Sequence, residues 1–231
     1  MRIYMNFGEA IEEIKRDLAE MGITVRPATM QDKYVKGNPD YETLELQNYA
    51  YTILNPNSGD EVLEQSLPSL EWARAEFEER VSPCFTNPGE AWKHRREVWD
   101  EYLHNGKFAY TYNERMHRNE QLYKIIDRIK QDPDSRQLWV SIWDPNIDPD
   151  NLGGVSRVPC SLGYNFQVRE GKLNIHYLMR SCDFATHMRN DIYLAIRLLE
   201  FVAGRTGYEV GTFTHTMFSL HVYKKDIKGV F

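Results

Sequence analysis

The stretch from Pro159 to Tyr223 decides the fold of this chain. It opens with a cysteine and a strand-like run, Pro159-Cys160-Ser161-Leu162-Gly163-Tyr164-Asn165-Phe166. The tetrapeptide Arg180-Ser181-Cys182-Asp183 follows, then an aspartate at position 191, and the stretch closes with Ser219-Leu220-His221-Val222-Tyr223. A purely structural protein would have no need of this combination of thiol, guanidinium and carboxylates.

The residues between these blocks predict regular structure. Two strands should meet at the turn Arg169-Glu170-Gly171-Lys172, and the apolar spacing of Ile192–Val202 predicts a long helix. Gly204 or Gly207 should end this helix, and a last strand is expected from about Tyr208 to Tyr223.

The N-terminal part alternates helical and strand patterns. The expected elements are a helix over 11–21 stopped by Gly22, a strand over 41–54, helical residues near 61–80, a helix over 122–129, a strand over 138–143 and a loop over 144–154. Because strands and helices do not alternate as βαβ units, they predict an α+β fold with helices on one face of a mostly antiparallel or mixed sheet.

Composition narrows the class of protein. With 231 residues, 42% hydrophobic, one domain spanning 1–231 is expected, and a net charge of −6 argues against a nucleic-acid-binding surface. Three cysteines without metal-binding spacing indicate free thiols, with neither disulfides nor a metal site. The N-terminus lacks an apolar signal region and no stretch could span a membrane, so a cytoplasmic protein is expected.

Cys160 is the candidate nucleophile. A cysteine thiolate can add to an electron-poor carbon of a substrate and activate the neighbouring carbon for reaction. A lone cysteine is more often a buried small hydrophobe, and only the surrounding motif favours the catalytic interpretation.

These blocks together resemble the nucleotide site of the thymidylate synthase family, from about residue 90 onward. The resemblance implies a bent mixed sheet flanked by helices, in a homodimer whose two sheets pack back to back. It also implies a pyrimidine nucleoside monophosphate as substrate and 5,10-methylenetetrahydrofolate as cofactor.

The resemblance assigns roles to several polar residues around the nucleotide. Arg180 and Ser181 would bind the phosphate, while Arg136, in Asp132-Pro133-Asp134-Ser135-Arg136, would reach the phosphate in the neighbouring subunit. The family carries a second arginine where this chain has Gln137. The remaining residues expected to contact the nucleotide are Asn165, His221 and Tyr223, the last two on one strand face at the sugar hydroxyl.

On the cofactor side the resemblance points to Asp183 and Trp99, and it places Tyr112 near the nucleophile. A carboxylate such as Asp183 suits the adjacent N–H donors of a pterin ring. Trp99 and Tyr112 could equally be core aromatics.

Asp191 is the informative departure, because the family has an asparagine here that reads uracil. Cytosine presents an N3 acceptor beside an N4 donor, which a carboxyl group matches better than an amide does. The run Met188-Arg189-Asn190-Asp191 is also similar to that of the deoxycytidylate hydroxymethylases of T-even phages. A shift of one residue at the helix start would instead turn Asn190 to the base.

Two family features are missing. A catalytic glutamate precedes a leucine-x-tryptophan run in the family, and here Ser69 precedes Leu70-Glu71-Trp72, so Glu71 is the candidate replacement despite pointing to another helix face. No N-terminal phosphate-binding loop is recognisable. Lys33 and Lys36 lie in a suitable stretch but read more readily as surface lysines.

The expected function is hydroxymethylation of carbon 5 of dCMP through a Cys160 adduct. Two alternatives stay open: a C5-methyltransferase acting on dCMP, CMP or dUMP, and a catalytically silent nucleotide-binding homologue.

Overall fold

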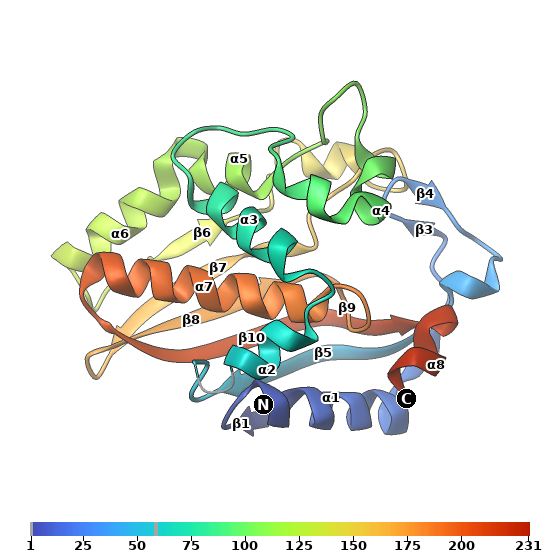
Figure 1. Cartoon of the computed structure of the whole chain (residues 1–231), viewed down its shortest axis with the longest axis horizontal. Coiled ribbons are helices and arrows are strands. Elements are labelled where there is room, and N and C mark those ends of the chain that lie inside the picture. The colour runs from blue at the N-terminus through green and yellow to red at the C-terminus, as the bar shows by residue number, and fades with distance from the viewer. Residues whose placement is uncertain (1, 58–59) are drawn as a thin grey trace.

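A mixed β-sheet covered by helices forms the centre of the chain (Figure 1). The computed structural model describes residues 2–57 and 60–231. The strands of this sheet in the described residues are β1 (Arg2–Tyr4), β2 (Ile23–Val25), β5 (Thr43–Ile53), β6 (Trp139–Ser141), β7 (Ser161–Arg169), β8 (Lys172–Met179), β9 (Cys182–Asp183) and β10 (Glu209–Tyr223). They are ordered β1-β5-β10-β8-β7-β6, with β2 paired to β5 and β9 paired to β10. A separate small hairpin joins β3 (Thr29–Met30) to β4 (Lys33–Tyr34).

Strand β10 makes the sheet mixed and brings the functional blocks together. It runs antiparallel to β5 but parallel to β8 and β9. In the β9 register His221 lies beside Asp183, so two blocks separated by almost forty residues in sequence become neighbours. The expected α+β fold with a mixed sheet is confirmed.

The turn between β7 and β8 confirms the expected hairpin. Glu170 and Gly171 both have positive φ, 53° and 76°, which is the backbone of a type I′ turn and matches the twist of the flanking strands. Glycine tolerates this conformation without strain.

Helices pack on the inner face of the sheet. They are α1 (Phe7–Met21), α2 (Asp60–Ser66), α3 (Leu70–Val81), α4 (Arg96–Trp99), α5 (Tyr112–His117), α6 (Gln121–Gln131), α7 (Met188–Thr206) and α8 (Ile227–Val230). The longest, α7, lies across β8 and β10 and buries Leu198, Leu199 and Val202, each worth about 1.5–3 kcal/mol of transfer free energy. It ends at Gly207, whose φ is 80°.

The helical region near 61–80 is divided in two. Pro68 disfavours continuation of α2, and Ser69 starts α3 by accepting a hydrogen bond from the Trp72 backbone N–H at 3.1 Å. The hydroxyl of Ser69 therefore serves as a helix N-cap.

The expected loop over 144–154 contains a short 3-10 helix, Asp148–Asn151. It is held by a buried ion pair in which the Arg115 guanidinium donates to both Asp148 carboxylate oxygens, at 2.7 and 3.2 Å. The preceding strand β6 is shorter than its apolar run suggests, and it forms one edge of the sheet.

The outer face of the sheet is polar. Along β10 the buried Phe213, His215 and Met217 alternate with partly exposed threonines at 212, 214 and 216. On the outer side His176 contacts Thr216 at 2.8 Å. The alternation shows that helices cover one face, since residues of the other retain solvent exposure.

Within residues 2–57 and 60–231, every helix is too short or too polar to cross a bilayer.

Candidate active site

A cavity of about 400 Å³ lies where β9, the end of β10 and the start of α7 face helices α3, α4 and α5. Eight residues singled out from the sequence line it: Cys160, Tyr112, Trp99, Ser181, Asp183, Asp191, His221 and Tyr223. The fold thus gathers most of the expected site residues, while their individual roles stay predictions.

Cys160 sits directly before β7 at the cavity wall. Its sulfur lies 3.5 Å from Gln31 Nε2 and 3.8 Å from a terminal guanidinium nitrogen of Arg180. Burial raises the pKa of the Cys160 thiol, and the Arg180 charge acts in the opposite direction. The cation beside the sulfur therefore offsets part of the desolvation of a thiolate.

Arg180 braces the segment that carries the nucleophile. Its Nε donates to the Pro159 carbonyl at 2.8 Å, and Nη2 donates to the Val158 carbonyl at 3.2 Å. Its backbone N–H also donates to the Cys160 carbonyl at 2.8 Å. Arg180 does not line the cavity itself. Its guanidinium is already bonded to the backbone before Cys160, so the expected phosphate contact would be made by a side chain that also holds this segment.

Gln31 is a contact that the sequence did not reveal. Its amide oxygen accepts from the Val158 N–H at 3.3 Å while its nitrogen faces Cys160. It belongs to the turn between β3 and β4, far from Cys160 in sequence, and no local pattern marks it. Nearby Lys33 also lines the cavity, paired with Glu101 at 2.6 Å, whereas Lys36 is exposed.

Tyr112 begins helix α5 and is oriented by its cap. Thr111 and Glu114 form a reciprocal capping box at this helix start. The Tyr112 hydroxyl then lies 2.9 Å from Ser161 Oγ, which also contacts the Tyr177 hydroxyl. This hydrogen-bonded chain fixes the tyrosine beside the cysteine loop.

Asp191 lies in the first turn of α7 and faces the cavity. Burial raises the pKa of its carboxyl group to about 7, with the Arg80 charge lowering it and Asp183 raising it further. The Cys182 thiol lies 3.8 Å from Asp191 Oδ2. Near neutral pH this carboxyl group is therefore available in both its acidic and its ionised form.

Asn190 also lines the cavity, so the one-residue alternative stays open. Its Nδ2 donates to the Thr186 carbonyl at 3.3 Å, and its buried Oδ1 has no hydrogen-bond partner within the described residues. A buried carbonyl oxygen of this kind accepts a donor from any ligand that reaches it.

Arg80 is the most consequential residue that sequence reasoning missed. It is only 5% exposed, yet it lines the cavity from α3, with its guanidinium 3.8 Å from the centre of the Tyr112 ring. Its Nε donates to Glu76 at 2.8 Å. The signal was present, since Trp72, Glu76 and Arg80 follow one another at intervals of four and so share one helix face.

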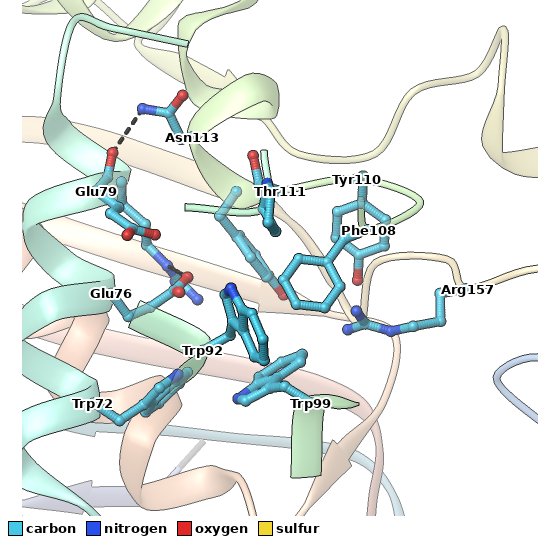
Figure 2. A pocket seen from close by; sticks show the side chains of 13 residues that line it. Trp72, Glu76, Glu79, Trp92, Trp99, Phe108, Tyr110, Thr111, Asn113 and Arg157 are labelled. Atoms are coloured by element: carbon cyan, nitrogen blue, oxygen red, sulfur yellow. Dashed lines mark hydrogen bonds and ion pairs between the residues drawn. The ribbon is translucent and has the colours of Figure 1, made fainter. Parts of the chain in front are cut away.

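A smaller aromatic pocket of about 40 Å³ adjoins the cavity, and the two share Trp72, Arg80, Trp99, Tyr110, Tyr112 and Arg157. Figure 2 shows the indoles of Trp72, Trp92 and Trp99 gathered beside Phe108, with Arg157 opposite. Trp72 and Trp99 stack with ring centres 5.9 Å apart, and the indole N–H of each is buried without a partner in the described chain.

The opposite wall carries the polar pair of β10. His221 and Tyr223 meet edge to face with ring centres 5.1 Å apart. Burial lowers the pKa of His221, so the imidazole is neutral at pH 7 and offers one donor and one acceptor. Asp183 Oδ1 accepts from the backbone N–H groups of Ala185 and Thr186, at 3.0 and 3.3 Å, which fixes the carboxylate.

Besides Arg180, three other expected residues do not line this cavity. The Glu71 side chain is 86% exposed and lies 3.6 Å from His94, because it points to the solvent side of α3; the hypothesis that it replaces the family glutamate is therefore corrected. Asn165 donates to the Leu138 carbonyl at 3.2 Å, on the sheet face opposite the buried Tyr164, and its contact with the nucleotide stays a prediction. Arg136 is exposed in the segment before β6. Its contact with the phosphate of a neighbouring subunit stays a prediction.

Comparison with known proteins agrees with this geometry. Residues 83–231 match the family model described as "Thymidylate synthase". A protein of Methanothermobacter marburgensis named "Putative thymidylate synthase" is 33% identical over 192 residues, covering 80% of each chain. A protein of Methanosarcina acetivorans with the same name is 35% identical over 59% of this chain, and the match spans 65% of that relative, slightly less than two thirds of its length.

The fold comparison extends over nearly the whole chain. The thermostable thymidylate synthase A of Bacillus subtilis superimposes with a TM-score of 0.75 over 97% of this chain and 82% of that one, at 21% identity. The chain belongs to the thymidylate synthase family.

Proposed function

We propose that the protein transfers a one-carbon unit from methylenetetrahydrofolate to carbon 5 of dCMP and releases the 5-hydroxymethyl nucleotide. The observation that carries this proposal is the Asp191 carboxyl group in the cavity, whose pKa is raised to about 7 by burial. As an acid it donates to the N3 lone pair of cytosine, and its carbonyl oxygen accepts from the N4 amino group. The O4 carbonyl of uracil would instead face the lone pairs of the ionised carboxylate, with no donor between them.

The chemistry starts with addition of the Cys160 thiolate to carbon 6 of the ring. The new C–S bond displaces the C5=C6 electrons toward carbon 4, and the C4=N3 electrons move onto N3. There they take the proton of Asp191. The ring becomes an enamine that is nucleophilic at carbon 5, and the negative charge has moved from sulfur to the Asp191 carboxylate.

The folate would lie in the larger cavity, against the aromatic wall that it shares with the small pocket. Trp72 and Trp99 supply flat apolar surface, and their indole N–H groups, which have no partner in the described part of the chain, can donate to a ligand. Asp183 offers a fixed carboxylate to the N–H donors of a pterin. When bound, this cofactor would supply a carbon unit at the oxidation level of formaldehyde.

The monophosphate would lie near Ser181 and Arg180, with the sugar hydroxyl at His221 and Tyr223. We propose a homodimer through the outer sheet face, in which Arg136 of one subunit completes the phosphate site of the other. The partly exposed threonines of β10 and His176 give this face hydrogen-bonding groups without a helical cover.

Incubation with dCMP and methylenetetrahydrofolate tests the reaction. The nucleotide should gain the mass of one formaldehyde unit, without the absorbance of dihydrofolate. Appearance of dihydrofolate would indicate a methyltransferase, and parallel reactions with CMP and dUMP decide the substrate.

Release of tritium from dCMP labelled at carbon 5 tests the first step alone, because thiolate addition is enough to labilise that proton. Binding of dCMP without tritium release would identify a catalytically silent homologue and refute the proposal.

A further inference from the structure

We propose that Arg80 is the positioning residue that makes Asp191 an effective reader of cytosine, by stabilising the carboxylate formed when Asp191 gives its proton to N3. This inference deepens the proposed function and rests on it. Arg80 would act through Asp191 and through the charge of the site.

The guanidinium of Arg80 is held at a definite place in the cavity wall. Glu76, one helical turn earlier on α3, accepts from Nε at 2.8 Å, and the centre of the Tyr112 ring lies 3.8 Å from the guanidinium carbon. Although burial disfavours its charge, Glu76 and the surrounding tyrosines hold the pKa of Arg80 above the ordinary value. Arg80 is therefore a permanent, oriented cation at the cavity.

Its terminal nitrogens remain available. Within the described residues the hydrogen bond and ion pair of the Arg80 side chain are made by Nε with Glu76. Five guanidinium N–H donors need partners when buried, so the two terminal groups suit a carboxylate, a ring oxygen or ordered water in the cavity.

Burial and the Asp183 charge favour the neutral form of Asp191, whereas the hydrogen bond from the Cys182 thiol and the Arg80 charge favour its carboxylate. Asp183 and the Cys182 thiol face Asp191 from β9. The Asp191 charge in turn raises the pKa of the surrounding thiol and phenol groups, which are those of Cys160, Tyr112, Tyr51, Tyr164 and Tyr177. Among these described groups, Arg80 contributes the positive charge that lowers the pKa of Asp191. Without Arg80 the pKa of Asp191 would be higher, and the carboxylate left after proton transfer to N3 would be less stable.

The two arginines stabilise the negative charge at different stages of the reaction. Before addition the negative charge lies on Cys160, beside Arg180; after addition it lies on Asp191, near Arg80. A fixed cation at the place where charge develops stabilises the transition state more than the ground state. Arg80 on α3 thus assists the proton transfer at the ring by stabilising the Asp191 carboxylate. Ser69, at the position of the family glutamate, has only a hydroxyl group, which is used as the N-cap of α3.

The test measures the titration of Asp191 itself. Carbon-13 NMR of protein labelled at the aspartate carboxyl carbons, with Asp191→Asn to assign the signal, should give a midpoint near pH 7 in the unsubstituted protein. Arg80→Met should raise this midpoint by about one to two units, because an opposite charge is lost, while Arg80→Lys should keep it close to the original value. Arg74→Met, at an exposed position of the same helix, is the matched control and should change nothing.

Activity provides the second readout. Arg80→Met should slow tritium release from dCMP about tenfold to a hundredfold, the rate equivalent of that pKa shift. In an Asp191→Asn background the same substitution should change dUMP turnover less than about threefold, since the titrating partner is gone.

An unchanged Asp191 midpoint in Arg80→Met, or an equal loss of rate in both backgrounds, would overturn the inference. If the unsubstituted protein does not react with dCMP, the proposed function fails, yet the NMR titration still decides whether Arg80 controls Asp191. If Arg80→Met does not fold, Arg80→Gln replaces it in the same measurements.

Discussion

Replacing Asp191 with asparagine should change how the stability of the protein depends on pH. The pKa of this carboxyl group is 3.8 for an ordinary aspartate and about 7 in the folded protein, because the site is buried. The folded state therefore binds a proton more tightly than the unfolded chain. Its contribution to stability is fully present below pH 3.8 and is lost as pH rises to 7.

The magnitude follows from the size of the shift. A difference of about 3 units, at about 1.36 kcal/mol per unit, corresponds to roughly 4 kcal/mol over the whole range, of which about 2–3 kcal/mol falls between pH 5 and 7. Asparagine has no such titration. The free energy of unfolding of the unsubstituted protein, minus that of Asp191→Asn, should therefore fall by that amount between pH 5 and 7 and stay level above pH 7.

Urea denaturation of both proteins, followed by circular dichroism at fixed protein concentration from pH 5 to 8.5, measures this difference. If the two stability curves run parallel, Asp191 ionises like an ordinary surface aspartate. It could then not deliver a proton to cytosine near neutral pH, and the mechanism proposed for the base would be wrong.

Three further outcomes are expected. Cys160→Ala should abolish tritium release from dCMP while leaving dCMP affinity, measured by calorimetry, within about threefold, because only bond formation is lost; residual release at the normal rate would rule out Cys160 as nucleophile. Glu71→Gln should leave activity within about twofold, since the side chain is 86% exposed, and a large loss would show that α3 rearranges in the reacting complex. Asp148→Asn should lower the free energy of unfolding by about 1–3 kcal/mol, because buried Arg115 keeps only its longer contact with Asp144 at 3.7 Å, and an unchanged stability would show that water replaces the lost partner.

Much of the fold could be predicted because its elements carry local signals. The β7–β8 hairpin was marked by Glu170-Gly171, and α7 by its apolar spacing and a terminal glycine. Strand order carries no such signal. That β10 pairs in parallel with β8 depends on the crossover through α7, which is decided by packing of the whole chain.

The site residues also differ in whether a local sequence signal marks them. Cys160, Asp183 and Asp191 could be found because they sit in contiguous motifs of the C-terminal part. Gln31 and Arg80 come from distant segments and reach the cavity only through tertiary packing. Glu71 was misplaced for a geometric reason: one helical residue turns the side chain by about 100°, and the buried face of α3 belongs to Trp72 and Arg80.

The stacked indoles of Trp72 and Trp99 give the molecule an optical reporter. Their ring centres lie 5.9 Å apart in the wall shared by the two pockets, and neither indole N–H has a hydrogen-bond partner among residues 2–57 and 60–231. A ring that enters the pocket would supply acceptors to those groups and alter the polarity around them, so tryptophan emission should change in intensity and wavelength. Occupancy could then be followed without a label, even in Cys160→Ala, where no product reports that the ligand has arrived.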